Sequence, residues 1–256
     1  MNNKEINLSK RMKAVVDMVP PHSCNIADVG CDHAYVSIYL KKEKNVDKVI
    51  AMDVREGPLD IARKNILEYG LVDSIDVRLS DGFNKLSPGE ADVIIVAGMG
   101  GLLIKDILMR GIDVLKTGVP PVLILQPQSD IDEVRIFLYS ISYHIEQETM
   151  VKEDGKYYTV IRAVYGKELC YRDKEDIVYG RCNILNKDSI LIEYLENEER
   201  VLKDILSGLN KINDYVPGDN DDNSTKIVRK KQRIEEIKEK LCINRKAYER
   251  CVRDEM

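Results

Sequence analysis

The amino-acid sequence predicts an α/β protein, in which an open and mostly parallel sheet is followed by an all-helical region. Short continuous runs of valine and isoleucine alternate with helical stretches from Asn25 to Leu125, which is typical of buried parallel strands. Beyond Gly166 no strand-like run follows. We therefore expect one domain in residues 1–166 and a second, helical domain in residues 167–256.

The predicted elements of the first domain come in a regular order. An amphipathic helix over residues 8–19 is stopped by Pro20-Pro21. Strands are then expected at 25–29, 48–53, 75–79, 92–97 and 121–125. Helices are expected between them and after them, at 34–41, 58–68, 102–110 and 131–140.

The end of this domain distinguishes two similar architectures. Two strand-like runs, 143–151 and 156–164, flank the turn signal Glu153-Asp154-Gly155, which predicts an antiparallel hairpin. Dehydrogenase-type Rossmann domains close with a parallel sixth strand, whereas class I methyltransferases insert a seventh strand antiparallel. The hairpin therefore favours a Rossmann-like, seven-stranded class I methyltransferase sheet.

The helical region has apolar residues at heptad-like spacing. They are Ile184, Leu191, Leu195, Leu202, Ile205 and Leu209 in one stretch and Ile227, Ile234, Ile237, Leu241 and Tyr248 in another. A polar loop, 217–223, separates them, and its end offers Asn223 and Ser224 as helix N-caps. This pattern predicts an antiparallel coiled-coil hairpin. The alternative is an ordinary helical subdomain packed on the sheet.

Composition narrows the class of protein. The chain has 256 residues and a net charge of -5, begins with a polar, charged segment and has no apolar run long enough for a membrane helix. We expect a cytoplasmic protein without a membrane partner. Its six cysteines never form a CxxC pair and its three histidines lie far apart, so no metal is expected. We expect a monomer, although the heptad seam could also close between two chains.

Three successive strand ends carry glycine or acidic residues. Gly30 follows the first strand, but Asp32 and Ala34 stand where a dinucleotide-binding loop has its second and third glycines. An acidic side chain there disfavours a pyrophosphate and suits a cationic sulfonium. Asp53 can accept from ribose hydroxyls and Asp81, before Gly82, from an adenine amino group. Either aspartate could instead be an ordinary helix cap, but together these strand ends predict an adenosyl site.

Ala97-Gly98-Met99-Gly100-Gly101 follows the fourth strand, at the edge where open α/β sheets bind ligands. We interpret it as lining of the active site, although its glycines could form only a tight turn. Gln126-Pro127 occupies the same edge after the fifth strand. The expected cofactor-binding residues are Asp28, Gly30, Asp53, Val54, Asp81, Gly82, Gly98 and Met99.

Several motifs resemble the bacterial tRNA (adenine-22-N1)-methyltransferases. They are LSKRM (8–12), DVGCDHAY (28–35), EGP (56–58), VRLSDG (77–82), AGMGG (97–101), LILQP (123–127) and EDGKYY (153–158). The resemblance implies methyl transfer from S-adenosylmethionine to N1 of an adenine in the D-arm of tRNA. We hypothesise that Asp32 accepts from the N6 amino group of that base or orients the methyl donor, with His33 and Tyr35 lining the base pocket.

The last segment of the chain is rich in lysine and arginine, which favours phosphate contacts, although such a run is often only a solvated helix face. The expected substrate-binding residues are Lys10, Arg11, Gly100, Gln126, Pro127, Lys230, Lys231 and Arg233. Three other functions stay open: a methyltransferase acting on another RNA base or a small molecule, an NAD-dependent Rossmann oxidoreductase, and a non-catalytic RNA-binding protein.

Overall fold

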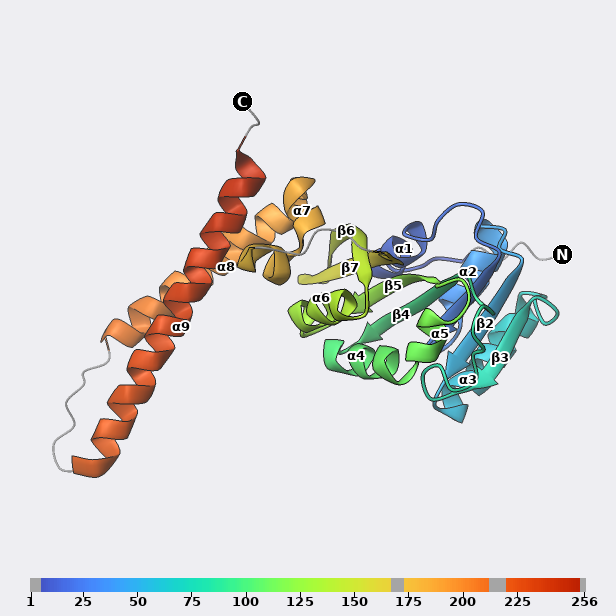
Figure 1. Ribbon diagram of the computed structural model, residues 1–256, viewed down its shortest axis with the longest axis horizontal. Coiled ribbons are helices and arrows are strands. Elements are labelled where there is room, and N and C mark those ends of the chain that lie inside the picture. The colour runs from blue at the N-terminus through green and yellow to red at the C-terminus, as the bar shows by residue number, and fades with distance from the viewer. Residues whose placement is uncertain (1–5, 167–172, 212–219, 254–256) are drawn as a thin grey trace. The chain divides into compact units, whose positions relative to one another are not determined.

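The computed structural model describes residues 6–166, 173–211 and 220–253, and the chain divides into two compact units, Met1–Cys170 and Tyr171–Met256 (Figure 1). The boundary predicted between residues 166 and 167 lies where an undescribed segment begins, so it stays a prediction.

The first unit is built on a seven-stranded sheet in the order β3-β2-β1-β4-β5-β7-β6. The strands are β1 (Asn25–Val29), β2 (Lys48–Asp53), β3 (Ile75–Leu79), β4 (Val93–Met99), β5 (Val122–Pro127), β6 (Tyr143–Glu153) and β7 (Lys156–Tyr165). The first five are parallel, and β7 lies antiparallel between β5 and β6. The predicted seven-stranded sheet with an antiparallel terminal hairpin is confirmed.

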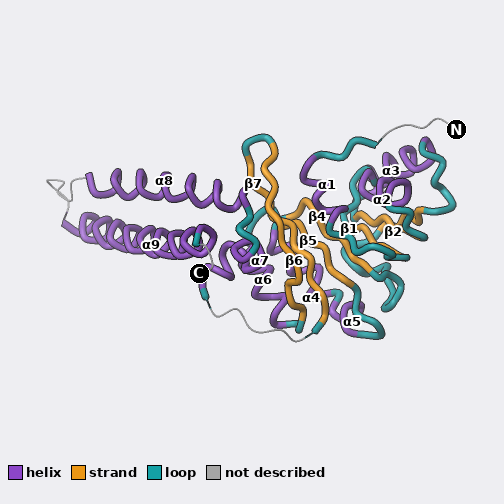
Figure 2. Tube along the Cα trace, turned by 90° about the horizontal axis from the view of Figure 1, so that it is seen from above, coloured by secondary structure: helices purple, strands orange, loops and turns teal. Residues whose placement is uncertain are grey.

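Helices cover both faces of this sheet. They are α1 (Lys10–Asp17), α2 (Tyr35–Glu43), α3 (Glu56–Glu68), α4 (Gly101–Arg110), α5 (Ile112–Lys116) and α6 (Ile131–Ser140). Helix α2 packs against α1 and α3 on one face, whereas α4 packs against α5 and α6 on the other (Figures 1 and 2). The short helix α5 was not predicted.

The central strands are buried on both faces, which explains their unbroken apolar sequences. Val93 to Val96 of β4 are at most 1% exposed, and Leu123 to Leu125 of β5 are fully buried. The core continues into α1 through Val15 and Val16. A rigid sheet thus supports the loops at its carboxyl edge.

The terminal hairpin turns through two residues. Glu153 pairs with Lys156, and both Asp154 (φ 50°) and Gly155 (φ 75°) adopt left-handed conformations. This is the Asp-Gly turn that matches the twist of paired strands. Because β5 ends its pairing with β7 at Leu125 and Ile161, the tip of the hairpin projects beyond the other strands (Figure 2).

The second unit is helical, as predicted. It contains a π-helical turn (Asp176–Gly180), α7 (Arg181–Leu185), α8 (Ser189–Lys211) and α9 (Asn220–Val252). Leu202 packs with Ile237 and Leu241, and the Asn244 side chain donates to the backbone oxygen of Leu195 (3.1 Å), so α8 and α9 pair antiparallel within the chain.

Three details of the predicted helical seam were wrong. Ile184 belongs to the separate helix α7, and Ile205 is 41% exposed, whereas Leu206 packs against the seam. Helix α9 begins at Asn220, so Asn223 and Ser224 lie inside it rather than at its cap.

Within the three described ranges, no helix combines the length and apolar character that crossing a membrane requires.

Candidate active site

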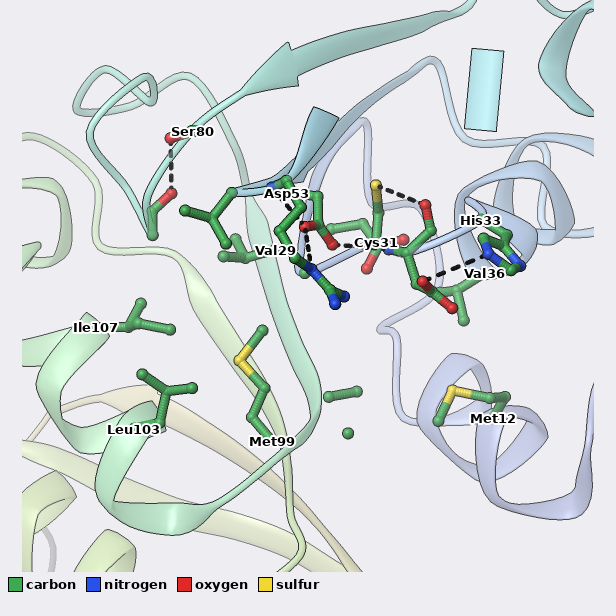
Figure 3. A pocket seen from close by; sticks show the side chains of 18 of the residues that line it. Met12, Val29, Cys31, His33, Val36, Asp53, Ser80, Met99, Leu103 and Ile107 are labelled. Atoms are coloured by element: carbon green, nitrogen blue, oxygen red, sulfur yellow. Dashed lines mark hydrogen bonds and ion pairs between the residues drawn. The ribbon is translucent and has the colours of Figure 1, made fainter. Parts of the chain in front are cut away.

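A cavity of about 610 Å³ opens at the carboxyl edge of the sheet, beside the point where the strand order reverses between β1 and β4 (Figure 3). Most of the predicted site residues in the first unit meet there. Those that line it are Arg11, Asp28, Gly30, Asp32, His33, Tyr35, Asp53, Val54, Asp81, Gly82, Gly98 and Met99.

The turn after β1 holds an unusual backbone. Gly30 (φ 77°), Asp32 (φ 50°) and Ala34 (φ 60°) all have left-handed conformations. The amides of Gly30 and Cys31 both donate to the backbone oxygen of Met52, which ties this turn to β2. A Cβ on Gly30 would lie 2.0 Å from Cε of Met99, so a larger residue would displace the end of the Met99 side chain, and the left-handed φ itself favours glycine.

Asp53 joins the turns that follow β1 and β2. Its buried carboxylate accepts the backbone N–H of Asp32 (3.2 Å) on one oxygen and that of Arg55 (2.9 Å) on the other. A carboxylate has about four acceptor positions, so both oxygens keep capacity toward the cavity. The geometry suits a ligand with two neighbouring hydroxyl groups.

Asp28 lies deeper and is 4% exposed. The hydroxyl of Ser37 donates to its carboxylate (2.6 Å). Burial, with a smaller contribution from the charge of Asp53, raises the pKa of Asp28 to about 6 against the lowering effect of the Ser37 hydrogen bonds. A cation bound in this cavity would stabilise the ionised form.

Asp81 lies in the loop after β3 and is exposed, and its carboxylate accepts hydrogen bonds from both terminal nitrogens of Arg110 (2.7 and 3.2 Å). This hydrogen bonding lowers the pKa of the Asp81 carboxyl. Arg110 thus fixes the orientation of a carboxylate at the cavity wall, where free acceptor positions can still meet an amino group. There is little room for a side chain at position 82, since a Cβ added to Gly82 would lie 3.2 Å from Ile107.

Met99, the last residue of β4, lines the cavity (Figure 3). The register between β4 and β5 shifts at Gly98 (φ 78°), whose N–H donates to the side-chain oxygen of Gln126 (3.1 Å). A Cβ on Gly101 would lie 2.3 Å from the backbone oxygen of Ser129. The glycines thus let this loop pass close to its neighbours while Met99 reaches the space above Gly30.

Asp32, His33 and Tyr35 lie together at the cavity wall. Nε2 of His33 is 3.6 Å from a carboxylate oxygen of Asp32, and the His33 and Tyr35 rings meet edge-on with centroids 6.3 Å apart. The Asp32 side chain is 61% exposed, so its carboxylate is accessible to a ligand. Their catalytic roles stay predictions.

Four other predicted residues of the first unit do not line the cavity. Gln126 and Pro127 are buried in β5, Gly100 lies beside the Ser129 hydroxyl, and Lys10 is exposed on the first turn of α1. Gln126 supports the wall of the cavity indirectly, because its side-chain oxygen accepts hydrogen bonds from the Gly98 N–H and from the Arg11 guanidinium.

Lys230, Lys231 and Arg233 belong to α9 in the second unit. Lys231 and Arg233 are exposed, and Arg233 pairs with Glu236 at 3.0 Å.

Sequence reasoning missed several residues of the cavity wall. They include Met12, Arg55, Leu103, Ile107 and Gln128. Leu103 and Ile107 are one helical turn apart on α4, directly after the glycine-rich turn, and this spacing is the signal that could have identified them. No group of three or more histidine, cysteine or acidic side chains in the described part of the chain is placed to hold a metal ion.

This sheet order, with a cavity bordered by carboxylates at its switch point, defines a class I S-adenosylmethionine-dependent methyltransferase, and residues 8–161 match the Methyltransferase domain family. The tRNA (adenine(22)-N(1))-methyltransferase of Bacillus subtilis (strain 168) is 40% identical over 162 residues, which are 63% of this chain and 67% of that protein. The chain therefore belongs to the tRNA (adenine(22)-N(1))-methyltransferase family.

Solved structures agree with this assignment. The crystal structure of the B. subtilis tRNA methyltransferase TrmK is 28% identical, with a TM-score of 0.78 over 95% of this chain and 100% of that chain. M. capricolum TrmK in complex with S-adenosyl-homocysteine is 30% identical, with a TM-score of 0.71 over 92% of this chain and 98% of that one.

Proposed function

We propose that this protein transfers the methyl group of S-adenosylmethionine to N1 of adenine 22 in tRNA. The observation that carries the proposal is the cavity in which Gly30, Asp53, Asp81 and Met99 converge, in a chain that belongs to the tRNA (adenine(22)-N(1))-methyltransferase family. Its volume, about 610 Å³, leaves room for a nucleoside cofactor and part of a second base.

The residues present fit this cofactor. When bound, S-adenosylmethionine supplies an electrophilic methyl group on a positively charged sulfur. Asp53 has free acceptor positions for the two ribose hydroxyls, and the Asp81 carboxylate, oriented by Arg110, can accept from the adenine amino group. Asp28 and Asp32 place negative charge in the same wall, which suits a cation.

The reaction makes modest demands on the protein. N1 of adenine attacks with its lone pair and needs no prior deprotonation, so positioning in line with the methyl group supplies most of the rate. Positive charge develops on the ring, and the Asp32 carboxylate can accept from the N6 amino group and stabilise it. His33 and Tyr35 border the space into which an extruded base would enter.

The exposed cations of α9, among them Lys231 and Arg233, would contribute to RNA binding through contacts with its phosphates. A tRNA substrate is also consistent with the expected cytoplasmic location. That location stays a prediction.

Identification of the methylated nucleoside tests the proposal. Purified protein is incubated with unmodified tRNA and labelled S-adenosylmethionine, and the digested RNA is analysed by mass spectrometry. We expect label in 1-methyladenosine only. Label in another nucleoside would show that the assigned base is wrong, and absence of label from every nucleoside would refute tRNA methylation.

A further inference from the structure

Helix α1 and the β6–β7 hairpin meet beside the cavity. The backbone N–H of Arg11 donates to the Glu153 carboxylate (3.4 Å), and the guanidinium carbon of Arg11 lies 5.0 Å from the ring centroid of Tyr158. Arg11 also lines the cavity. One residue therefore joins the projecting hairpin to the wall of the active site.

The two faces of the hairpin differ. Directly paired residues point to the same side of a strand pair, and side chains alternate along each strand. Glu153 pairs with Lys156, two positions from Tyr158, so Lys156 shares the face that contacts α1. Lys152 pairs with Tyr157 on the opposite face, where its ammonium lies 5.3 Å from that ring.

Three cations come from α1 and from the face of the hairpin that contacts it. Among the described residues, neither Lys10 nor Lys156 has an ion-pair partner, and both are exposed. Nε of Arg11 is buried and has no hydrogen-bond acceptor within the described part of the chain. Glu153 is the carboxylate among them and already contacts Arg11, while Asp154 lies beyond them at the turn.

We propose that Lys10, Arg11 and Lys156 form a phosphate-binding cluster that holds the RNA backbone next to the nucleotide whose base enters the cavity. The inference rests on the proposed function. An extruded base needs its flanking backbone fixed, and phosphate contacts by lysine and arginine supply this positioning. Lys156 lies about 17 Å beyond the last β5–β7 pair at the spacing of an extended strand, so it can reach a phosphate outside the cavity.

A pair of variants of the full chain tests the cluster. Lys156→Ala and Lys152→Ala remove the same charge from opposite faces of one hairpin. Binding of labelled tRNA is measured by fluorescence anisotropy at several salt concentrations, together with kcat and KM for tRNA. S-Adenosylmethionine affinity by calorimetry controls for folding.

We expect Lys156→Ala to weaken tRNA binding severalfold and to reduce the slope of log affinity against log salt by roughly 0.7 to 0.9, the value of one lost phosphate contact. KM for tRNA should rise with cofactor affinity unchanged, and Lys152→Ala should match the wild type. If tRNA binding by Lys156→Ala equals that of the wild type, or if both variants lose tRNA affinity equally, the proposed phosphate-binding cluster is wrong. A wild type that leaves tRNA unmethylated would refute the proposed function instead.

Discussion

At Gly30 the backbone has a φ of 77°, and an added Cβ would lie 2.0 Å from Cε of Met99, so the end of that side chain would have to move. Gly30→Ala should therefore weaken S-adenosylmethionine binding severalfold, because the new methyl group displaces Met99 within the cavity, in addition to left-handed strain of ~1–2 kcal/mol. Gly70→Ala is a matched control, since Gly70 has a φ of 69° and open space around it. Calorimetry should show wild-type cofactor affinity for the control; equal losses in both variants would contradict the account.

Asp32 has a φ of 50°, a conformation that asparagine also adopts readily. Asp32→Asn thus removes the charge and preserves the turn. If the carboxylate stabilises the developing positive charge, kcat should fall roughly a hundredfold, as for other lost electrostatic contacts of this kind, and cofactor affinity should fall much less. Steady-state methylation of tRNA measures this, and near-wild-type turnover would exclude the role.

Asp28 makes stability depend on pH. Its pKa is about 6 in the folded protein and about 3.9 in an unfolded chain. The folded state binds this proton more tightly, so burial costs nothing below about pH 4, costs progressively more between pH 4 and 6, and costs roughly 3 kcal/mol above pH 6.

Asp28→Asn retains an acceptor for Ser37 and removes the buried charge. We expect the variant to unfold at higher urea concentration than the wild type at pH 8, with the gain shrinking toward pH 4.5. A gain that is the same at both pH values would show that the charge of Asp28 is not its source.

At the scale of elements, the turn between β4 and α4 depends on close backbone packing. A Cβ on Gly101 would meet the backbone oxygens of Ser129 (2.3 Å) and Asp130 (2.6 Å), whereas one on Gly100 would meet only the Ser129 hydroxyl (3.2 Å). Gly101→Ala should lower the free energy of unfolding by about 1–3 kcal/mol, as overpacking does, and Gly100→Ala by less. Urea denaturation measures both free energies of unfolding. Equal losses in the two variants would contradict the packing described.

Elements were predictable where the signal is local. Asp154-Gly155 determines the hairpin turn by its own backbone preferences, and strand periodicity needs only neighbouring residues. The beginning of α9 was missed because asparagine and aspartate suit the first turn of a helix as well as a loop.

Contacts between distant residues were not predictable. Arg11 and Gln126 lie 115 positions apart, and only the folded sheet brings the guanidinium and the Gly98 amide to one side-chain oxygen. The cavity positions of Asp28, Gly30, Asp53 and others followed from strand ends, since parallel strands present their carboxyl ends at one edge.

At the scale of the whole molecule, the second unit should contribute to RNA binding without contributing to cofactor binding. Replacing Lys230, Lys231 and Arg233 together with alanine should weaken tRNA binding and lower the salt slope by about 2 to 3, if each residue contacts one phosphate. The affinity for S-adenosylmethionine should not change, which calorimetry can establish.

A matched triple variant controls for net charge. Lys64, Lys85 and Lys116 are exposed in the first unit and do not line the cavity. Their replacement with alanine should leave the salt slope near that of the wild type. If both triple variants lose tRNA affinity equally, α9 has no special part in binding.

The most direct test of methylation at adenine 22 is label transfer from S-adenosylmethionine to two tRNA transcripts that differ only at position 22. We predict incorporation into the transcript with adenine at this position and none into the transcript with guanine. Equal incorporation into both would contradict the assigned position, and absence of label from both would contradict the assigned activity.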